Sequence, residues 1–271
     1  MKMKWKKRIM LLTVLVLTIL TGCGKDNSNV SSNIEFGESD LEYVQSKGTL
    51  VVGITDFAPM DYLDGEKWVG FDAKLAEAFA ESIGVTVEFV EIDWDKKTEL
   101  LENGSIDCIW NGMTMTEELT KTISCSNPYL SNAQVVVLRR SEMGQYSTAE
   151  DCQHILFAVE EGSTGETLLK ELKYRFTAYP TQMEALESVL EKKADATVID
   201  IIMAAYYTDD GHEFDDLGFD ITLNDETICV GFRKDSDITE KANEFLANAY
   251  EDGTISSLSE QYGIENAVLK Y

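Results

Sequence analysis

The chain of 271 residues is poor in histidine, since His154 and His212 are the only two and stand far apart. A metal centre or a catalytic cluster built on histidine is therefore not indicated. The sequence also lacks a Ser-His-Asp or Cys-His arrangement that would support hydrolysis. We expect no metal ion, no cofactor and no catalytic residue in this protein.

A long apolar segment is missing as well. The run Ile9–Leu20 has only twelve residues, too few to span a bilayer comfortably. It follows five basic residues, which predicts a signal peptide over residues 1–22. The motif Leu20-Thr21-Gly22-Cys23 resembles the bacterial lipobox and predicts a lipid on Cys23. Residues 23–46 would then be a flexible tether at the extracytoplasmic face of the cell membrane.

Basic residues are also scarce, with 23 Lys and Arg against 49 Asp and Glu. Residues 1–22 hold five of the basic residues and no acidic one, so the rest of the chain has a formal charge of −31. Such a charge argues against nucleic acid and against an anionic membrane surface as partners. It would make the surroundings of a cleft attractive to cations, although most of it is expected on the solvated surface.

Apart from Cys23, the chain has four cysteines: Cys108, Cys125, Cys152 and Cys229. None shows the spacing of a metal site. Four cysteines allow three pairings, and the sequence does not choose among them. Our expectation is four free thiols that behave as small apolar groups.

The first part of the folded region alternates apolar strands with helices. The helical segment that begins at Gly70 places Phe71, Leu75 and Phe79 on one face and is closed by Gly84. Strand, helix, strand, helix, strand is the order of a parallel α/β sheet. The predicted strands lie within residues 47–54, 85–92 and 105–109, and the predicted helices within 70–83 and 96–102.

A second α/β unit follows, and the C-terminal helices are expected to pack back on the first. The chain would then cross between two lobes twice and form a hinge that closes over a ligand. We place lobe 1 at residues 47–136 plus 231–271 and lobe 2 at residues 137–230. The predicted strands of the second part are 134–138, 155–159, 176–178, 196–200 and 226–233, with helices at 165–172 and 181–192.

Each lobe presents a polar residue at the end of a buried strand, Asn111 in the first and Asp200 in the second. Ligands of open α/β sheets bind at such strand ends, so each lobe could supply half of one site. Simpler interpretations stay open. Thr116 could cap an ordinary helix, Asp200 could be a helix N-cap, and the tryptophans Trp94 and Trp110 could be core residues.

Several motifs, in this order and spacing, resemble the extracellular solute-binding proteins that serve amino-acid ABC importers. The likeness covers about residues 48–263 and implies a two-lobed periplasmic-binding-protein (Venus-flytrap) fold. It also implies a monomer that binds a small amino-acid-like solute and delivers it to an ABC transporter permease. The motifs are Gly70-Phe-Asp-Ala-Lys-Leu-Ala, Asn111-Gly-Met-Thr-Met-Thr, Ser126-Asn-Pro-Tyr129, Gly162-Ser-Thr-Gly-Glu166, Ala194-Asp-Ala-Thr-Val-Ile-Asp200 and the tail around Lys234, Ala242 and Asp252-Gly-Thr254.

The resemblance also implies which residues bind the solute. Its α-amino and α-carboxylate groups would meet Gly112, Thr114, the Ser163-Thr164 turn at a helix N-terminus, and Asp200. Aromatic rings would stack on it, and an acid would contact its side chain. The full expected set is Asp56, Phe57, Trp94, Asn111, Gly112, Thr114, Leu119, Ser163, Thr164 and Asp200.

Leu119 departs from the pattern, because family members normally carry at this position an Arg that clamps the ligand carboxylate. Without that fork, acidic amino acids are expected to bind poorly, and cationic or neutral amino compounds better. Two other functions remain possible on the same fold. One is a dehydratase-type enzyme, for which Asp56 and Asp200 are the candidate acid and base, and the other is a sensor input protein.

Overall fold

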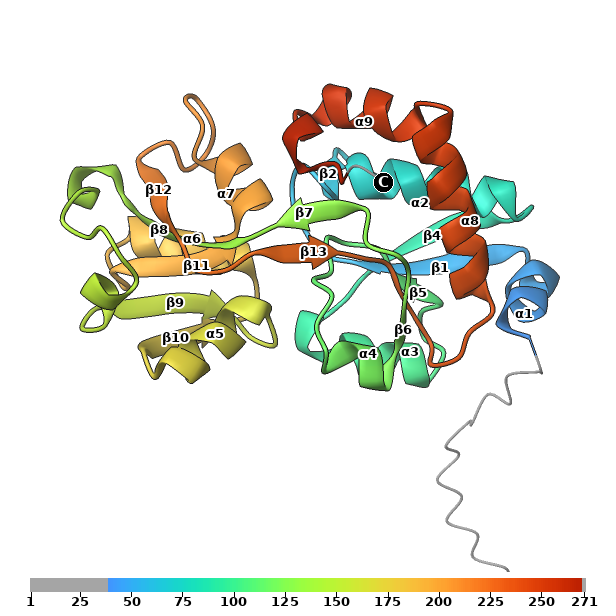
Figure 1. The fold of residues 1–271 in the computed structure, drawn as a ribbon, viewed down its shortest axis with the longest axis horizontal. Helices are drawn as coiled ribbons and strands as arrows, with labels where there is room; N and C mark the ends of the chain where they lie inside the picture. Colours follow the sequence, from blue (N-terminus) through green and yellow to red (C-terminus); the bar gives the residue numbers. More distant parts are fainter. Residues whose placement is uncertain (1–38, 270–271) are drawn as a thin grey trace, which may run out of the picture. The chain divides into compact units, whose positions relative to one another are not determined.

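The computed structural model describes residues 39–269, and the predicted signal peptide, Cys23 and most of the tether lie outside them. Within this range, no helix combines the length and apolar character that crossing a bilayer requires. Two five-stranded sheets, each flanked by helices, make up the fold (Figure 1). The predicted α/β architecture is therefore confirmed.

The sheet of lobe 1 has the strand order β4-β1-β5-β14-β6. The first three strands are parallel, as predicted, whereas β14 runs antiparallel to β5 and β6 because it belongs to the returning chain. The strands are β1 (Thr49–Ile54), β4 (Thr86–Glu91), β5 (Cys108–Ile109), β6 (Ser124–Cys125) and β14 (Gly231–Phe232), and a small hairpin pairs β2 (Tyr62–Asp64) with β3 (Lys67–Val69).

Helices cover both faces of this sheet because its strands are apolar on both sides. One face packs on α2 and on the C-terminal helices α8 and α9, as expected for a tail that returns to lobe 1. The other face packs on α3 and α4. These helices are α2 (Phe71–Ser82), α3 (Lys97–Glu102), α4 (Leu119–Thr122), α8 (Ile238–Glu251) and α9 (Thr254–Tyr262), with 3₁₀ turns η1 (Trp94–Lys96) and η4 (Glu265–Ala267).

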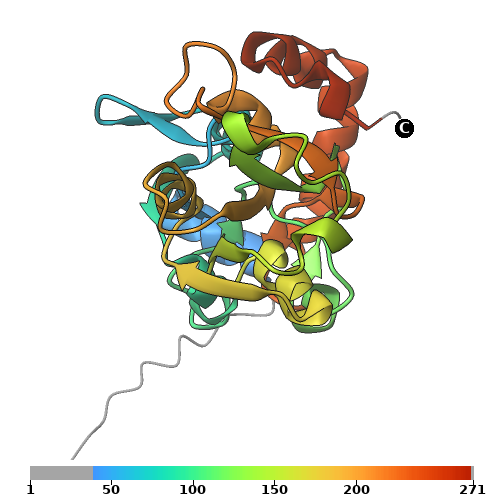
Figure 2. The ribbon, with the colours of Figure 1, turned by 90° about the vertical axis from the view of Figure 1, so that its left-hand side faces the viewer.

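Lobe 2 has the strand order β10-β9-β11-β8-β12 (Figure 2, in which it faces the viewer). Its sheet packs on α6 and α7 on one face and on α5 on the other. The elements are β8 (Gln134–Arg139), β9 (Leu156–Glu160), β10 (Arg175–Tyr179), β11 (Ala196–Asp200), β12 (Leu217–Thr222), α5 (Thr164–Leu172), α6 (Gln182–Leu190), α7 (Ile201–Tyr207) and 3₁₀ turns η2 (Arg140–Glu142) and η3 (Glu150–Cys152).

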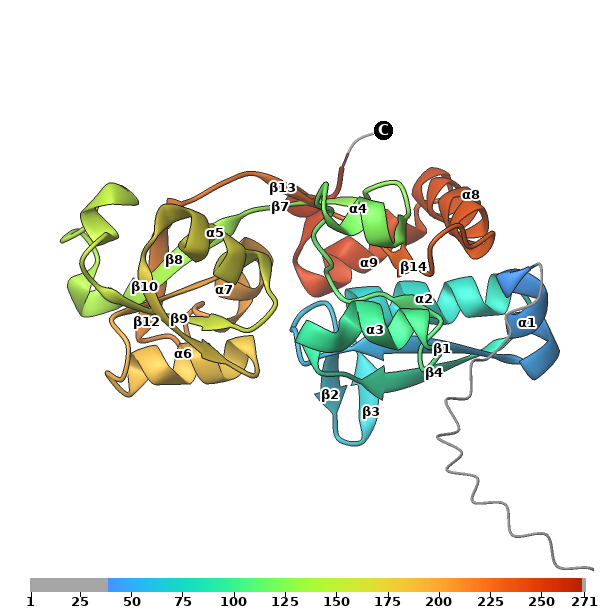
Figure 3. The same ribbon diagram turned by 90° about the horizontal axis from the view of Figure 1, so that it is seen from below.

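Two short strands, β7 (Leu130–Asn132) and β13 (Glu226–Ile228), connect the sheets as an antiparallel ribbon (Figures 1 and 3). They are the two predicted crossings. Two expected boundaries were wrong. Residues 134–136 belong to lobe 2, because they pair with β11 and β12. The expected strand 226–233 is divided, since its first part stays in the ribbon and its last part enters the lobe 1 sheet.

The expected tether also ends earlier than residue 46, because Asp40–Lys47 forms helix α1. Ser39 caps this helix by accepting a hydrogen bond from the Glu42 N–H. Asp40 forms an ion pair with Arg233, at 3.0 Å, and both side chains are largely buried. Residues 40–46 are thus part of the folded body and not of a flexible segment.

Candidate functional site

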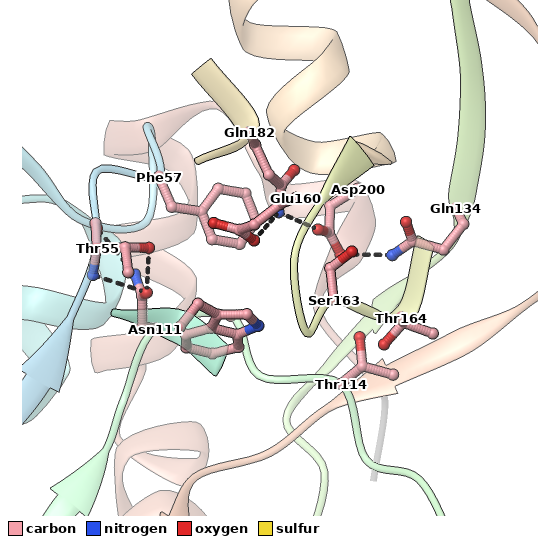
Figure 4. A pocket seen from close by; sticks show the side chains of 12 residues that line it. Thr55, Phe57, Asn111, Thr114, Gln134, Glu160, Ser163, Thr164, Gln182 and Asp200 are labelled. Atoms are coloured by element: carbon pink, nitrogen blue, oxygen red, sulfur yellow. Dashed lines mark hydrogen bonds between the residues drawn. The ribbon is translucent and has the colours of Figure 1, made fainter. Parts of the chain in front are cut away.

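A pocket lies between the two lobes, at the carboxyl ends of several strands (Figure 4). It holds about 330 Å³ of empty space, counted together with its opening to solvent. The lining combines two aromatic rings with polar groups from both lobes: Thr55, Phe57, Trp94, Asn111, Gly112, Thr114, Gln134, Glu160, Ser163, Thr164, Gln182 and Asp200.

Asn111 follows strand β5 and holds the lobe 1 wall together. Its side-chain oxygen accepts hydrogen bonds from the N–H and the hydroxyl of Thr55, at 2.8 and 2.7 Å. Its amide nitrogen donates to the Thr55 carbonyl and to the buried carboxyl of Asp61. The side chain is therefore fully engaged within the protein.

Gly112 is the point where the backbone comes closest to the pocket's aromatic wall. Its φ of +56° favours glycine, and a Cβ atom here would lie 2.2 Å from the Phe57 ring. The Gly112 N–H donates to Asp72 at 2.7 Å, which leaves the carbonyl as the group that could accept from a ligand. Burial raises the pKa of Asp72 to about 7, although hydrogen bonds from Gly112 and Tyr129 oppose the shift.

Thr114 is anchored to the hinge ribbon. It pairs with Ile228 of β13 in an isolated bridge, whose hydrogen bonds are made by the neighbours Met113 and Met115. The Thr114 hydroxyl donates to Glu226 of the same ribbon at 2.9 Å. This loop of the pocket is therefore connected directly to a crossing strand.

Asp200 ends β11 and is held by three neutral amides. Asn132 and Gln134 donate to its Oδ1, and Gln182 donates to its Oδ2 at 2.9 Å. Asp200 stands at the start of α7, but its side chain makes no capping hydrogen bond. Asp200 thus occupies the N-cap position as the alternative expected, but capping does not account for its carboxyl group.

Asp200 also lies beside a second acid, Glu226. The amide nitrogens of Asn132 and Gln134 each donate to both carboxyl groups. Burial and then the charge of Glu226 raise the pKa of Asp200 to about 6, although the amide hydrogen bonds lower it. Glu226 of the ribbon and Asp200 of lobe 2 therefore lie next to each other.

Glu160 is the third acid, at the end of β9, and only 4% of its surface is exposed. The Gln182 amide donates to it at 3.5 Å. Burial, followed by the charge of Asp200, raises the pKa of Glu160 to about 8. Among residues 39–269, no ion pair includes Glu160, Asp200 or Glu226.

The N-terminus of α5 contributes the remaining lobe 2 surface. The Ser163 hydroxyl accepts a hydrogen bond from the Glu166 N–H and so caps this helix. The N–H groups of the first turn, beginning at Thr164, carry the partial positive charge of a helix N-terminus. An anionic group could bind here.

A lysine bridges the two lobes next to the pocket. The Lys97 ammonium donates to the carbonyls of Trp94 in lobe 1 and Gly162 in lobe 2, at 3.1 and 3.0 Å. It also lies 4.6 Å from the centre of the Trp94 ring, a cation–π distance. Burial lowers the pKa of Lys97 to about 8, against the charge of Glu160. Lys97 therefore fixes the position of Trp94.

The structure brings eight of the ten expected site residues to this pocket. Asp56 is exposed and outside the lining, because the extended chain turns Thr55 and Phe57 inward and the residue between them outward. Leu119 packs with Met115 and lines an adjacent groove that also contains Lys97. That groove shares Trp94, Thr114, Ser163 and Thr164 with the pocket, but Leu119 is not part of the pocket lining. Thr116 caps the short helix α4 as expected, since its hydroxyl accepts a hydrogen bond from the Leu119 N–H at 3.1 Å.

Four lining residues were missed: Thr55, Gln134, Glu160 and Gln182. Glu160 could have been found, because it ends a strand just as Asp200 does. Gln182 begins a helix and has no comparable signal in the sequence. Trp110 is fully buried against Phe79 and Phe245, which confirms its interpretation as a core residue.

No group of three or more His, Cys, Asp or Glu in the described part of the chain is arranged to hold a metal ion. Residues 50–265 match the bacterial extracellular solute-binding proteins, family 3. The chain belongs to this family. The sequence motifs therefore pointed to the correct family, and the two-lobed fold is the one its structural neighbours share.

Individual relatives of this family 3 protein match along nearly their whole length. The arginine-binding extracellular protein ArtP of Bacillus subtilis (strain 168) is 28% identical over 267 residues, which cover 95% of this chain and 98% of ArtP. An ABC uptake transporter substrate-binding protein of Streptococcus pneumoniae, solved with bound histidine, has a TM-score of 0.79 at 29% identity and covers 86% of this chain and 99% of its own. The ancestral amino acid-binding protein AncCDT-1, a precursor of cyclohexadienyl dehydratase, has a TM-score of 0.77 at 30% identity, with 83% and 99% covered.

Proposed function

We propose that this protein is the lipid-anchored substrate-binding component of an ABC importer, and that it captures a cationic amino acid between its two lobes. The family supports solute capture, and relatives named for arginine binding or solved with histidine support an amino acid. The predicted signal peptide and lipobox support export and anchoring through Cys23.

The observation that carries the choice of ligand is the set of acids at the pocket. Asp200, Glu160 and Glu226 lie close together, and their hydrogen-bond partners are neutral amides and a hydroxyl. Buried carboxylates that form no ion pair are unfavourable, as the raised pKa values of Asp200 and Glu160 indicate. A ligand with positive charge would reduce the electrostatic repulsion between these carboxylates.

An amino acid would fit the pocket in one orientation. Its α-ammonium would bind Asp200 and the Gly112 carbonyl, and its α-carboxylate would face Thr114 and the N-terminus of α5. Phe57 and Trp94 would pack on the side chain, with Glu160 near its distal end. A cationic side chain would then have its own carboxylate partner and an aromatic face, worth about 2 kcal/mol when desolvated.

The ligand carboxylate would rely on N–H and hydroxyl donors, because Leu119 stands where the resemblance expects an Arg. Lys97 lies close by, but its ammonium is already bound by two carbonyl groups. We therefore keep the expectation that acidic amino acids bind poorly.

We propose a binding protein and not an enzyme. Glu160 is the group that would act as a general acid in a dehydratase-type protein, because its raised pKa keeps it protonated near neutral pH. Asp200 is the other acid of the lining, but among residues 39–269 it is hydrogen-bonded to amides and not to Glu160. A ligand recovered unchanged after binding is expected.

Calorimetry with purified protein tests the proposal. Arginine, lysine and histidine should bind more tightly than glutamine, and glutamate should bind least. Chromatography of the released ligand should recover the compound that was added. Equal or tighter binding of glutamate would contradict the ligand class, and a chemically altered product would contradict the assignment as a receptor.

The anchor is tested by Cys23→Ser. The variant should leave the membrane fraction and keep the parental thermal midpoint, because the buried core of residues 39–269 does not include Cys23. If the variant is recovered with membranes at the parental level, the lipid on Cys23 is not the anchor.

A further inference from the structure

Two cysteine thiols in lobe 1 touch each other although no disulfide joins them. The four described cysteines are free, and Cys125 and Cys229 are hydrogen-bonded to one another. The other two are not paired in this way. Cys108 is buried in β5, and the Cys152 thiol is directed at the Thr148 carbonyl.

The backbone explains why these two thiols meet. Cys125 of β6 is paired with Gly231 of β14, and the Ser126 N–H donates to the Val230 carbonyl at 2.9 Å. Cys229 precedes Gly231 by two residues, so in an antiparallel ladder it is the diagonal neighbour of Cys125 on the same face. Strand register therefore holds the pair in place.

The two thiols differ in their access to solvent. Cys229 is fully buried, whereas Cys125 is half-buried and lines a surface groove that holds about 770 Å³ of empty space, counted together with its opening to solvent, and that also includes Lys234. Hydrogen bonding with Cys229 and the charge of Lys234 hold the pKa of Cys125 below its usual range, against the effect of burial. An accessible thiol of lowered pKa in front of a buried second thiol is the arrangement of reversible redox pairs.

We propose that Cys125 and Cys229 form a reversible disulfide that ties the two crossing strands together at their lobe 1 ends. Cys125 lies shortly before β7, where the chain leaves lobe 1, and Cys229 directly follows β13, where it returns (Figure 1). The bond would close a loop that contains all of lobe 2. It would also fix the base of the hinge, since the Cys229 N–H donates to Met113 beside the pocket loop.

The bond forms by thiol–disulfide exchange with an external disulfide, such as oxidised glutathione or the disulfide of an oxidoreductase. The Cys125 thiolate attacks one sulfur of the oxidant, and one thiol leaves. The Cys229 thiol, whose proton passes to the departing thiolate, then attacks the Cys125 sulfur of the mixed disulfide and releases the second thiol. The protein loses two hydrogen atoms and is oxidised, while the external disulfide gains them and is reduced.

This inference goes beyond the proposed function, and its chemistry does not depend on the identity of the solute. Only the oxidising setting depends on the proposed export, since disulfides persist outside the cytoplasm. The pairing can therefore be tested on the purified chain whether or not the receptor assignment holds.

The test uses the full chain with Cys23→Ser, which leaves the four described thiols. After treatment with oxidised glutathione, the intact mass should fall by two hydrogen atoms, and a non-reducing peptide map should show Cys125 linked to Cys229. The oxidised protein should melt at a higher temperature than the reduced protein, because the cross-link restricts the unfolded chain.

Single variants separate the two roles. Cys229→Ser should stop at a stable glutathione adduct on Cys125, and Cys125→Ser should form no adduct, because the remaining thiols are buried. Cys152→Ser is the matched control and should still form the linked pair. A stable adduct on Cys125 in the parent protein, a link to Cys108 or Cys152, or no reaction at all would each overturn the proposal. If a variant does not fold, the peptide map of the oxidised parent protein still shows whether Cys125 is linked to Cys229.

Discussion

Asn111 and Asp200 occupy equivalent places in the two lobes, each at the carboxyl end of a central strand, yet they differ in charge and in their hydrogen-bond partners. Asn111 is neutral, and its donors and acceptor are all bound by Thr55 and Asp61. Asp200 is an acid held by three neutral amides beside a second acid. The hydrogen bonding of the first is complete, whereas the second still lacks a positive partner.

The comparison separates structural from binding roles in one pocket. Because all its hydrogen-bonding groups have partners, Asn111 has a structural role and holds the lobe 1 wall of the pocket together. Its neighbour Gly112 is positioned by a hydrogen bond to the buried Asp72. Neither Asp200 nor Glu160 forms an ion pair among residues 39–269, although the charge of Lys97 acts on Glu160, so we propose that a ligand cation binds these two acids. Whether a side chain at a strand end can bind a ligand therefore depends less on its residue type than on whether its hydrogen-bonding and charged groups already have partners within the protein.

The largest expected effect is on ligand affinity. Asp200→Ala would leave the ligand ammonium buried without its charge partner, which costs roughly 3–5 kcal/mol. This corresponds to a loss of about two to three and a half decades in affinity for the cationic amino acid found by calorimetry. A change below threefold would show that Asp200 is not the ammonium partner.

A second prediction concerns stability and pH in the ligand-free protein. Asp200 has a pKa of about 6 in the fold and 3.8 as its reference value. Between these values the folded state holds a proton that the unfolded chain has lost, so stability falls as pH rises from about 4 to 6. The loss is about 3 kcal/mol above pH 6, since one pKa unit corresponds to 1.36 kcal/mol.

Asp200→Asn removes this titration and keeps the shape of the side chain. Urea unfolding at several pH values should show the variant gaining stability relative to the parent between about pH 4 and 6. A difference that does not change with pH would mean that Asp200 titrates normally. Asp72, whose pKa is also raised, is present in both proteins and cancels. Glu160 does not cancel, because the charge of Asp200 contributes to its raised pKa, so the comparison is limited to the range from about pH 4 to 6.

A smaller effect is expected at the other strand end. Asn111→Ala would leave the Thr55 N–H without a partner and remove the side-chain donor to the buried Asp61 carboxyl, which should lower the free energy of unfolding by about 2–3 kcal/mol. Asn103→Ala, in an exposed turn, is the matched control and should cost less than about 1 kcal/mol. If both variants are equally stable, Asn111 does not have the structural role proposed for it, and the distinction drawn between Asn111 and Asp200 is contradicted.

The sequence was informative wherever local rules decide the structure. The strand Ala196–Asp200 and the helix closed by Gly84 follow from apolar periodicity and end signals, and the motifs identified the family. The strand-end rule found Asn111 and Asp200, but it was not extended to Glu160. It could not show that the Asn111 side chain is already bonded, because Thr55 and Asp61 are distant in sequence.

Other errors came from tertiary contacts that no local pattern encodes. Helix α1 was expected to be tether, yet Asp40 is held by Arg233 from the far end of the chain. Gln182 reaches Asp200 from the start of a helix. Asp56 was expected in the pocket on the strength of the resemblance, and the alternation of the extended chain turns it to solvent.

The smallest expected effect concerns Glu160, and it would sharpen the comparison within lobe 2. Glu160→Gln keeps the size and hydrogen bonding of the side chain but removes its charge. If Glu160 meets a distal cationic group, the variant should lose affinity for arginine by roughly tenfold, or about 1.4 kcal/mol. Glutamine, which has no distal cation, should bind the variant and the parent about equally. Because the pKa of Glu160 is near 8, the parent should also bind arginine more tightly at pH 8.5 than at pH 6.5, and Glu160→Gln should lose most of this difference. An equal loss for arginine and glutamine would place Glu160 in the framework of the pocket, and Asp200 would then be the single carboxylate that the ligand completes.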